Sequence, residues 1–321
     1  MAPSKVKLGI LLPTRGLIMA GDHPQDAGLI MDMAQRVEEA GLDSVWVGDS
    51  LTAKPRLEPL VTLAAVAAHT QRVRLGTAVL LAALRQPVLL AQMAATVDLI
   101  SGGRLVLAVG AGGAFNQSQR KEWSVVGVKP SQRGRRLEEV MEVVKRLGRE
   151  ASVTFQGRHI RLENVAIEPR PTQTEGIPIL FACHLRAQRE TQFRRAARLG
   201  DGIISISETP QDFAEVRQRV EGYAREYGRD SSATESTFYM TVNLNRDEAQ
   251  AHREADTYLK AYYGVNIWED LWGPWGPPEM IAERIGQYHQ AGAETIIIRF
   301  ASFQPMAQLE TFLQDVIPRL I

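Results

Sequence analysis

The sequence contains little that would tie the chain to a metal, to another macromolecule or to a membrane. Its 321 residues include one cysteine, Cys183, which excludes an internal disulfide and a cysteine-based metal cluster and favours a reducing compartment. The 37 basic residues balance 37 acidic ones, so no net charge attracts nucleic acid or an anionic membrane. No run of about 18 apolar residues occurs, and the first residues lack the apolar core of a signal peptide. We therefore expect a cytoplasmic protein that acts on a small molecule.

Motifs that mark several large enzyme classes are also missing. The chain has no Gly-x-Gly-x-x-Gly followed by an acidic residue, no Gly-Lys-Ser phosphate loop, no Gly-x-Ser-x-Gly and no His-Glu-x-x-His. Hydrolase and metalloenzyme interpretations therefore lack their usual anchors. Hydrophobic residues make up 45% of the chain and charged residues 23%, which is typical of a globular protein with a sizeable core.

The most informative segment that is present runs from Val73 to Gly110. It begins with the apolar, β-branched run VRLGTAVLL, which is typical of a strand buried on both faces of a parallel sheet. Pro87 then starts a helical repeat of apolar residues that stops at Gly102. A second buried strand over 104–109 leads into the glycine-rich sequence GAGG. The segment is one βαβ unit, and α/β proteins usually bind their ligands where such strands end.

Strand and helix patterns alternate along the rest of the chain and predict a TIM (β/α)8 barrel, with residues 1–321 as a single domain. We also expect a small hairpin over 153–167 and an aromatic, Gly/Pro-rich insert over 264–278. The remaining predicted strands are 5–12, 43–47, 177–182, 202–205, 237–244 and 295–299. The remaining predicted helices are 25–40, 57–69, 131–147 with Ser131 as N-cap, 191–199, 211–227, 246–263, 279–291 and 306–316.

The segment LGTAVLLAALRQPVLLAQMAATVDLISGGRLVLAVGAG, residues 75–112, resembles the signature of the luciferase-like flavin oxidoreductases. That family includes bacterial luciferase, alkanesulfonate monooxygenase and enzymes that use the deazaflavin coenzyme F420. Five further blocks follow the family's order, so the resemblance covers essentially the whole chain. It implies a TIM-barrel flavoprotein, a homodimer, and either reduced FMN supplied by a separate flavin reductase or coenzyme F420. The blocks are GLDSVWVGD, RGRRLEEVMEVVKRL, QGRHIRLENVAIEPRP, AARLGDGII and PPEMIAERIGQYHQAGAETIIIR.

The resemblance also implies where the cofactor binds. Thr77, Ala78 and Val79 match the place where several members carry a non-proline cis peptide that bulges against the ring. Asp49 closes the second strand and could bind the ring or its ribityl chain; the alternative is a helix cap or a salt bridge. Asn116 could bind ring or ribityl hydroxyls; the alternative is an Asx-turn.

The end of the fifth strand departs from the family. Many relatives have a Gly-Gly pair there, whose backbone amides hold the cofactor phosphate, whereas this chain has Ala182, Cys183 and His184. We expect the backbone amides to remain available and His184 to add a donor. Gly110 and Gly112, after the fourth strand, complete the expected cofactor site.

The expected substrate side consists of Arg15, just beyond the first strand, and Trp272, in the late insert. The alternatives are a salt bridge for Arg15 and core or lid packing for Trp272. Large apolar side chains on an irregular segment are suited to shielding a cofactor from water. No metal ligand set is expected, and no catalytic residue is identified.

Two departures bear on the reaction. The family's sugar-phosphate dehydrogenases have a histidine where this chain has Ser50 and a glutamate where it has Gly113. Because both proton-transfer groups are missing, the sequence favours an FMN-dependent monooxygenase. A deazaflavin-dependent reductase or dehydrogenase is the alternative, and a non-catalytic ligand-binding barrel is a third interpretation.

Overall fold

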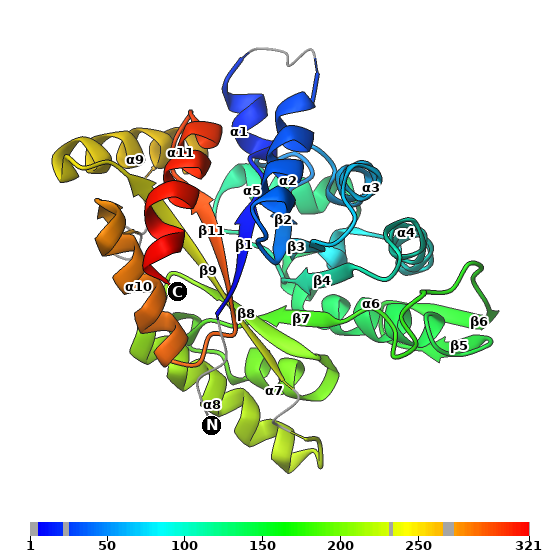
Figure 1. Ribbon diagram of the computed structural model, residues 1–321. Helices are drawn as coiled ribbons and strands as arrows, with labels where there is room; N and C mark the ends of the chain where they lie inside the picture. Colours follow the sequence, from blue (N-terminus) through cyan, green and yellow to red (C-terminus); the bar gives the residue numbers. More distant parts are fainter. Residues whose placement is uncertain (1–5, 22–25, 231–233, 266–272, 321) are drawn as a thin grey trace.

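The computed structural model describes residues 6–21, 26–230, 234–265 and 273–320. Eight parallel strands form a closed barrel surrounded by helices (Figure 1), so the predicted (β/α)8 fold is confirmed. Two pairings close the barrel: the first strand pairs with the last, and β8 pairs with β9. In order around the barrel the strands are β1 (Lys7–Leu11), β2 (Ser44–Val47), β3 (Arg74–Leu80), β4 (Leu105–Val109), β7 (Ile179–Ala182), β8 (Gly202–Ile206), β9 (Glu235–Leu244) and β11 (Thr295–Phe300).

Helices follow the strands and pack their apolar faces against the outside of the barrel. In the helix Gly28–Glu39, which precedes β2, Ile30, Met33, Ala34 and Val37 repeat at helical spacing and are all buried. The helices are α1 (Thr14–Met19), α2 (Gly28–Glu39), α3 (Pro59–His69), α4 (Pro87–Ser101), α5 (Gln117–Val125), α6 (Arg133–Leu147), α7 (Glu190–Leu199), α8 (Pro210–Glu226), α9 (Glu248–Tyr263), α10 (Pro278–Gln290) and α11 (Pro305–Thr311).

The barrel interior is a separate apolar core, and Trp46 is its largest side chain. Its indole Nε1 donates a hydrogen bond to Ser44 Oγ at 2.8 Å. The ring fits because the two neighbouring strands have glycine beside it: a Cβ on Gly9 or Gly76 would overlap Trp46. Side chains of the opposite alternation, such as Val45 and Val47, face the helices instead. Each strand is therefore buried on both faces, as its apolar sequence predicts.

Local signals explain where most helices begin and end. As predicted, α4 starts at Pro87 and stops at Gly102, which has a φ of 65°; the side chain of Gln86 caps its first turn. The prediction of Ser131 as N-cap is wrong. Residues 130–132 form a 3-10 turn, and α6 begins at Arg133 with Gln132 in the N-cap position.

Several short elements were not predicted from sequence. α1 and α5 form in segments that read as loops, and part of the late insert is a two-residue strand, β10 (Trp275–Gly276), paired with β9. The predicted hairpin is present as β5 (Val153–Gln156) and β6 (Arg161–Val165) and projects beside α6 in Figure 1. Glu139 of α6 accepts hydrogen bonds from three backbone amides of the hairpin turn, at 2.7–3.0 Å.

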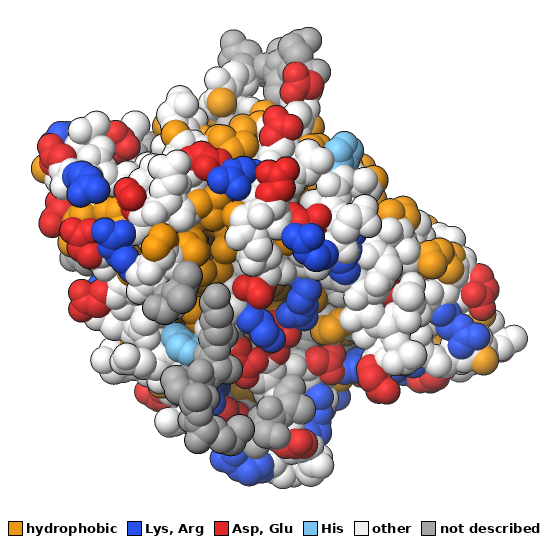
Figure 2. All heavy atoms as spheres, in the orientation of Figure 1, with side chains coloured by type: hydrophobic (Ala, Val, Ile, Leu, Met, Phe, Trp, Pro, Cys, Tyr) orange, Lys and Arg blue, Asp and Glu red, His pale blue; other side chains and the backbone are white. Residues whose placement is uncertain are grey.

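One face of the molecule shows no large area of one charge (Figure 2). On the face drawn in Figure 2, acidic and basic side chains are interspersed. Within the described ranges there is no helix long and apolar enough to cross a membrane and no cluster of three metal-ligating side chains.

Candidate active site

A cavity of about 190 Å³ opens at the carboxyl ends of the barrel strands. This is the end at which barrels of this type bind their ligands. Its wall is apolar on one side and rich in cations and tyrosines on the other. The lining residues are Asp49, Lys54, Arg56, Ala78, Val79, Leu81, Ala182, His184, Ile204, Ser205, Ile206, Tyr239, Tyr262 and Tyr263.

The apolar wall is formed by three adjacent strands that end in small residues. The peptide between Ala78 and Val79 in β3 is cis, as the resemblance predicts, and the pairing of β3 with β4 shifts register there. β4 is followed by Gly110, on which a Cβ would lie 2.8 Å from Val79 Cγ2. β7 ends at Ala182, which also lines the cavity. Ala78 and Ala182 keep side-chain bulk out of this part of the cavity, which we call the recess, and Gly110 leaves room for the Val79 side chain beside it.

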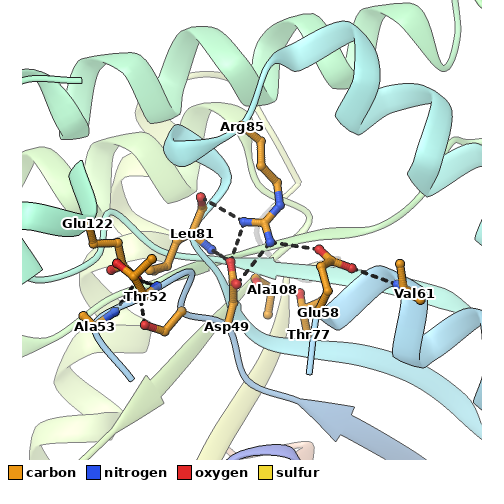
Figure 3. Close-up of polar contacts among 11 residues, drawn as sticks. Asp49, Thr52, Ala53, Glu58, Val61, Thr77, Leu81, Arg85, Ala108 and Glu122 are labelled. Carbon is orange, nitrogen blue, oxygen red and sulfur yellow. Dashed lines mark hydrogen bonds and ion pairs between the residues drawn. The ribbon is translucent and has the colours of Figure 1, made fainter. Parts of the chain in front are cut away.

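Asp49 lies at the edge of this recess with both carboxylate oxygens occupied (Figure 3). It accepts hydrogen bonds from the Leu81 amide at 2.8 Å and from Arg85 at 2.6 and 3.1 Å. Arg85 also contacts Glu58, whose other oxygen caps α3 by accepting from the Val61 amide. The salt bridge foreseen as the alternative for Asp49 is therefore present, and it fixes the end of β2 to the turn after β3.

A buried carboxylate of α5 shapes the loop after β2. Glu122 accepts hydrogen bonds from Ser50 Oγ at 2.7 Å and from the amides of Thr52 and Ala53 at 2.9 and 3.2 Å (Figure 3). Ser50 Oγ in turn accepts from the Lys54 amide at 2.9 Å. The serine at this position is thus part of the loop's support and holds Lys54 at the cavity.

The amides at the end of β7 are already used within the protein, so the expectation that they remain available is wrong. The Cys183 amide donates to Ile204 O at 3.0 Å, and the His184 amide donates to Gln192 Oε1 at 2.9 Å. Leu185 donates to Glu208 Oε1 at 3.0 Å. The thiol of Cys183 is fully buried, and burial raises its pKa to about 12.

His184 and Glu208 form a titratable pair on this side of the cavity. Burial lowers the pKa of His184 to about 4, so its imidazole is neutral at pH 7. Burial raises the pKa of Glu208 to about 7, against the opposing effect of the Leu185 amide. The His184 Nδ1 and Glu208 Oε1 atoms lie 3.8 Å apart, beyond hydrogen-bond distance. His184 lines the cavity and Glu208 lies behind it.

Four cations and four tyrosines gather at and beside the opposite wall. Lys54, Arg56, Tyr239, Tyr262 and Tyr263 line the cavity itself, whereas Arg15, Arg299 and Tyr258 line an adjoining cavity that shares Arg56 and Tyr262. The guanidinium carbons of Arg15, Arg56 and Arg299 lie 5.0, 5.5 and 5.1 Å from the ring centre of Tyr262. Lys54 Nζ lies 4.4 Å from the ring centre of Tyr263. The other two tyrosines are Tyr239 and Tyr258. We call this set the cation–tyrosine cluster.

The structure brings together many of the residues predicted from sequence. Asp49, Ala78, Val79, Ala182 and His184 line the cavity. Thr77, Gly110, Gly112 and Cys183 lie behind this lining, and Arg15 belongs to the cation–tyrosine cluster.

Two predicted residues stand apart from this group. Asn116 forms a capping box at the start of α5 with Gln119, which is a capping role close to the alternative foreseen for it. Trp272 lies outside the described residues.

Sequence reasoning missed most of the charged wall. The one available signal was Arg299, an arginine within the otherwise apolar strand sequence TIIIRF. Lys54 and Arg56 stand in a loop whose path depends on Glu122, some seventy residues away, and nothing local indicates it.

Comparison with known proteins gives a family match and curated relatives. The family model of the luciferase-like monooxygenases matches residues 6–266. A F420-dependent glucose-6-phosphate dehydrogenase of Kineococcus radiotolerans is 34% identical over 239 residues, which cover 70% of this chain and 66% of that protein. A protein of the same name from Amycolatopsis mediterranei is 28% identical over 91% of this chain and 94% of its own length.

Solved structures share the fold. A monooxygenase from Streptomyces bottropensis superposes with a TM-score of 0.80, over 98% of this chain and 100% of that one, at 23% sequence identity. At this identity the likeness shows a shared barrel architecture.

Proposed function

The chain belongs to the luciferase-like monooxygenase family, and from this premise we propose that it is an oxidoreductase that uses the deazaflavin coenzyme F420 on a small organic substrate. The two curated relatives described above are both named F420-dependent dehydrogenases, which supports the deazaflavin alternative better than the FMN monooxygenase favoured by the sequence. The observation that carries the proposal is a cavity at the carboxyl end of the barrel with a recess of small residues on three adjacent strands.

The recess fits a flat ring system. Ala78, Ala182 and Gly110 keep side-chain bulk away from the β3–β4–β7 wall, and a Cβ on Gly110 would crowd Val79. A bound ring would lie against this wall, with Asp49 at its edge held rigid by Arg85. When bound, coenzyme F420 supplies a carrier that accepts or donates a hydride.

A phosphate on the cofactor would be held by side chains, because the β7 amides are occupied. Arg133 brings a positive charge to the glycine-rich loop, where its Nε donates to Gly112 O at 3.1 Å. Burial lowers the pKa of Arg133, and the nearby charge of Arg189 adds to this effect. Within the described part of the chain, neither arginine has a carboxylate within salt-bridge distance. We assign the cofactor's phosphate to this pair.

Proton transfer would fall to groups other than those of the sugar-phosphate dehydrogenases. Ser50 donates to Glu122, and a side chain at Gly113 would crowd Gln119. The cavity instead offers Tyr262, whose hydroxyl can donate a proton. His184 also lines the cavity, and because burial lowers its pKa to about 4 it serves there as a neutral hydrogen-bonding group.

A homodimer and a cytoplasmic location belong to the same proposal. α3 and α4 lie side by side in Figure 1 and expose Val61, Leu89 and Met93. Exposed aliphatic side chains on neighbouring helices favour a contact with a second copy. Cys183, the one cysteine, is a buried free cysteine, and this usage suits a reducing compartment.

The test is a titration of the purified protein with coenzyme F420 and, separately, with reduced and oxidised FMN, followed by cofactor fluorescence and absorbance. We expect F420 to bind and Ala182→Leu, which fills the recess, to weaken binding at least about tenfold. Ala182→Ser, which keeps the recess open, should change the affinity less than about twofold. Binding of FMN alone would favour the monooxygenase, and binding of neither would favour a non-catalytic barrel; each result contradicts the proposal.

A further inference from the structure

The cation–tyrosine cluster concentrates positive charge at one end of the cavity. Arg15 follows β1, Lys54 and Arg56 follow β2, and Arg299 lies in β11. These three strands are neighbours in the barrel (Figure 1), so the four side chains converge although they come from opposite ends of the sequence.

The charge of the two loops is not neutralised by the protein that the structure describes. Arg15 donates to two backbone carbonyls, Tyr262 O at 3.2 Å and Pro55 O at 3.3 Å. Arg56 Nε donates to Lys54 O at 3.1 Å. In the described ranges, no Asp or Glu forms an ion pair with Arg15, Lys54 or Arg56. Carbonyl oxygens satisfy donors but supply no opposite charge.

Several other partly buried cations in this protein either contact a carboxylate or stand alone. Arg85 contacts Asp49 and Glu58, Lys145 contacts Asp201, and the largely buried Arg195 contacts Glu138. Arg104 and Arg136 are held by backbone carbonyls, but neither of them belongs to a group of cations around a shared tyrosine ring, as Arg15, Arg56 and Arg299 do around Tyr262. Arg15, Lys54 and Arg56 are half-buried, and neighbouring like charges that lose part of their hydration are costly unless an anion joins them.

The electrostatics of the cluster agree with this geometry. Burial lowers the pKa of Lys54 to about 8; Tyr262 acts in the opposite direction, and Arg56, Arg15 and Arg299 reinforce the lowering. Burial would raise the pKa of Tyr262, but the same four cations outweigh it and bring that pKa below its usual value. The shifts of Lys54 and Tyr262 therefore both indicate an excess of positive charge around them, which an anion would relieve.

We propose that the cation–tyrosine cluster binds the anionic group of the substrate, a carboxylate, phosphate or sulfonate, and so restricts this enzyme to small anionic substrates. The assignment of this anionic group to the substrate, and not to the cofactor, rests on the proposed function. β1 and β7 are four strands apart in a barrel of eight, so the cluster lies across the barrel from the β4–β7 wall, the side on which Arg133 contacts the glycine-rich loop. An anion held by Lys54 and Arg56 shares the cavity with the Ala78–Val79 recess, so the rest of the molecule extends toward it.

The experiment measures inorganic phosphate and sulfate binding to the full chain without cofactor, by calorimetry and by the shift in Tm at constant ionic strength set with chloride. Both anions should bind and raise Tm. Lys54→Gln and, separately, Arg15→Gln should weaken binding at least about tenfold, whereas Lys54→Arg should retain most of it. The control is Lys121→Gln, which removes an exposed lysine of α5 and should leave binding unchanged. Circular dichroism establishes that each variant is folded.

A second set of binding measurements, with coenzyme F420, tests whether the anionic group belongs to the substrate or to the cofactor. Coenzyme F420 should bind wild type and Lys54→Gln with equal affinity, and saturating phosphate should not displace it. Equal phosphate affinity in wild type, Lys54→Gln and Arg15→Gln would overturn the site. Parallel loss of F420 affinity in Lys54→Gln, with displacement of F420 by phosphate, would overturn the assignment to the substrate. Phosphate binding without any F420 binding would contradict the proposed function and leave the anion site standing.

Discussion

At the scale of single residues, the molecule encloses charge in two contrasting ways. Asp49 is almost completely buried, and its charge is met by Arg85, which is itself largely enclosed. The loop cations of the cluster have no such partner among the described residues. Asp49 therefore serves the stability of the cavity's edge, whereas the cluster is suited to binding.

Truncating Arg85 should be strongly destabilising. Arg85→Ala leaves the Asp49 carboxylate, 2% exposed, without its cation, and we expect the free energy of unfolding to fall by about 3 kcal/mol or more. The matched control is Arg36→Ala, which breaks a pair with Glu310 in which both side chains are 35% exposed and should cost less than about 1 kcal/mol. Urea unfolding of the three proteins measures both values. Equal losses in the two variants would contradict the structural role of Asp49.

Glu208 should make stability depend on pH in the direction opposite to most carboxylates. Burial raises its pKa from 4.5 to about 7, so its contribution to stability is complete below pH 4.5 and is lost as the pH rises to about 7. Glu208→Gln removes this loss. Relative to wild type, the variant should become more stable between pH 4.5 and 8 by up to about 3 kcal/mol.

Urea unfolding at several pH values checks this prediction. Glu226→Gln, which changes a largely exposed carboxylate at the end of α8, is the control and should shift by less than about 1 kcal/mol over the same range. A Glu208→Gln variant whose difference from wild type stays constant with pH would show that this carboxyl group titrates normally.

Residue-level prediction from sequence identified cavity-lining positions where a side chain's position follows from its own strand. Ala78, Val79, Ala182 and His184 lie at or near strand ends, and the parallel barrel brings all strand ends to one edge. It failed for Lys54, because the loop that carries it is held by contacts distant in sequence.

At the scale of elements, the size of an inward-facing side chain on one strand of the barrel is matched by small residues on the neighbouring strands. Trp46 occupies space that Gly9 and Gly76 leave on the two flanking strands, so the packing of one strand dictates the sequence of its neighbours. An apolar pattern identifies these strands, but it cannot reveal which glycine makes room for which ring.

Gly76→Ala tests this packing. The added Cβ would overlap the fully buried Trp46 ring, so we expect a loss of about 2 to 3 kcal/mol in the free energy of unfolding. Gly222→Ala in α8 is the control, since its Cβ meets nothing within 4 Å and alanine favours a helix by about 0.5 to 1 kcal/mol. Chemical denaturation should therefore give changes of opposite sign. A neutral Gly76→Ala would mean that Trp46 does not depend on the glycine.

Elements that depend on tertiary contacts were the ones that sequence reasoning missed. α5 is polar, and it forms where a capping box starts it and where Glu122 and Trp123 are buried against the loops after β2 and β4. The predicted strands, in contrast, needed no partner to be recognised, because burial on both faces leaves an uninterrupted apolar run.

At the scale of the whole molecule, the exposed apolar side chains of α3 and α4 predict self-association. Val61→Asp and Leu89→Asp each place a charge on this surface and should convert a dimer into a monomer by light scattering. Val125→Asp changes an equally exposed valine on α5 and should leave the dimer intact. A monomeric wild-type protein at micromolar concentration would contradict the prediction.

The pairing of β1 with β11, which closes the barrel, also determines when during synthesis the cation–tyrosine cluster can form. Arg15 follows β1 and Arg299 lies in β11, so the cation–tyrosine cluster cannot exist until nearly the whole chain has left the ribosome. Until then β1 keeps an unpaired edge, open to association with other nascent chains. An anion that binds the cluster stabilises the finished barrel and no shorter intermediate. Ligand supply can therefore raise the yield of completed molecules, but it cannot guide the early steps of their synthesis.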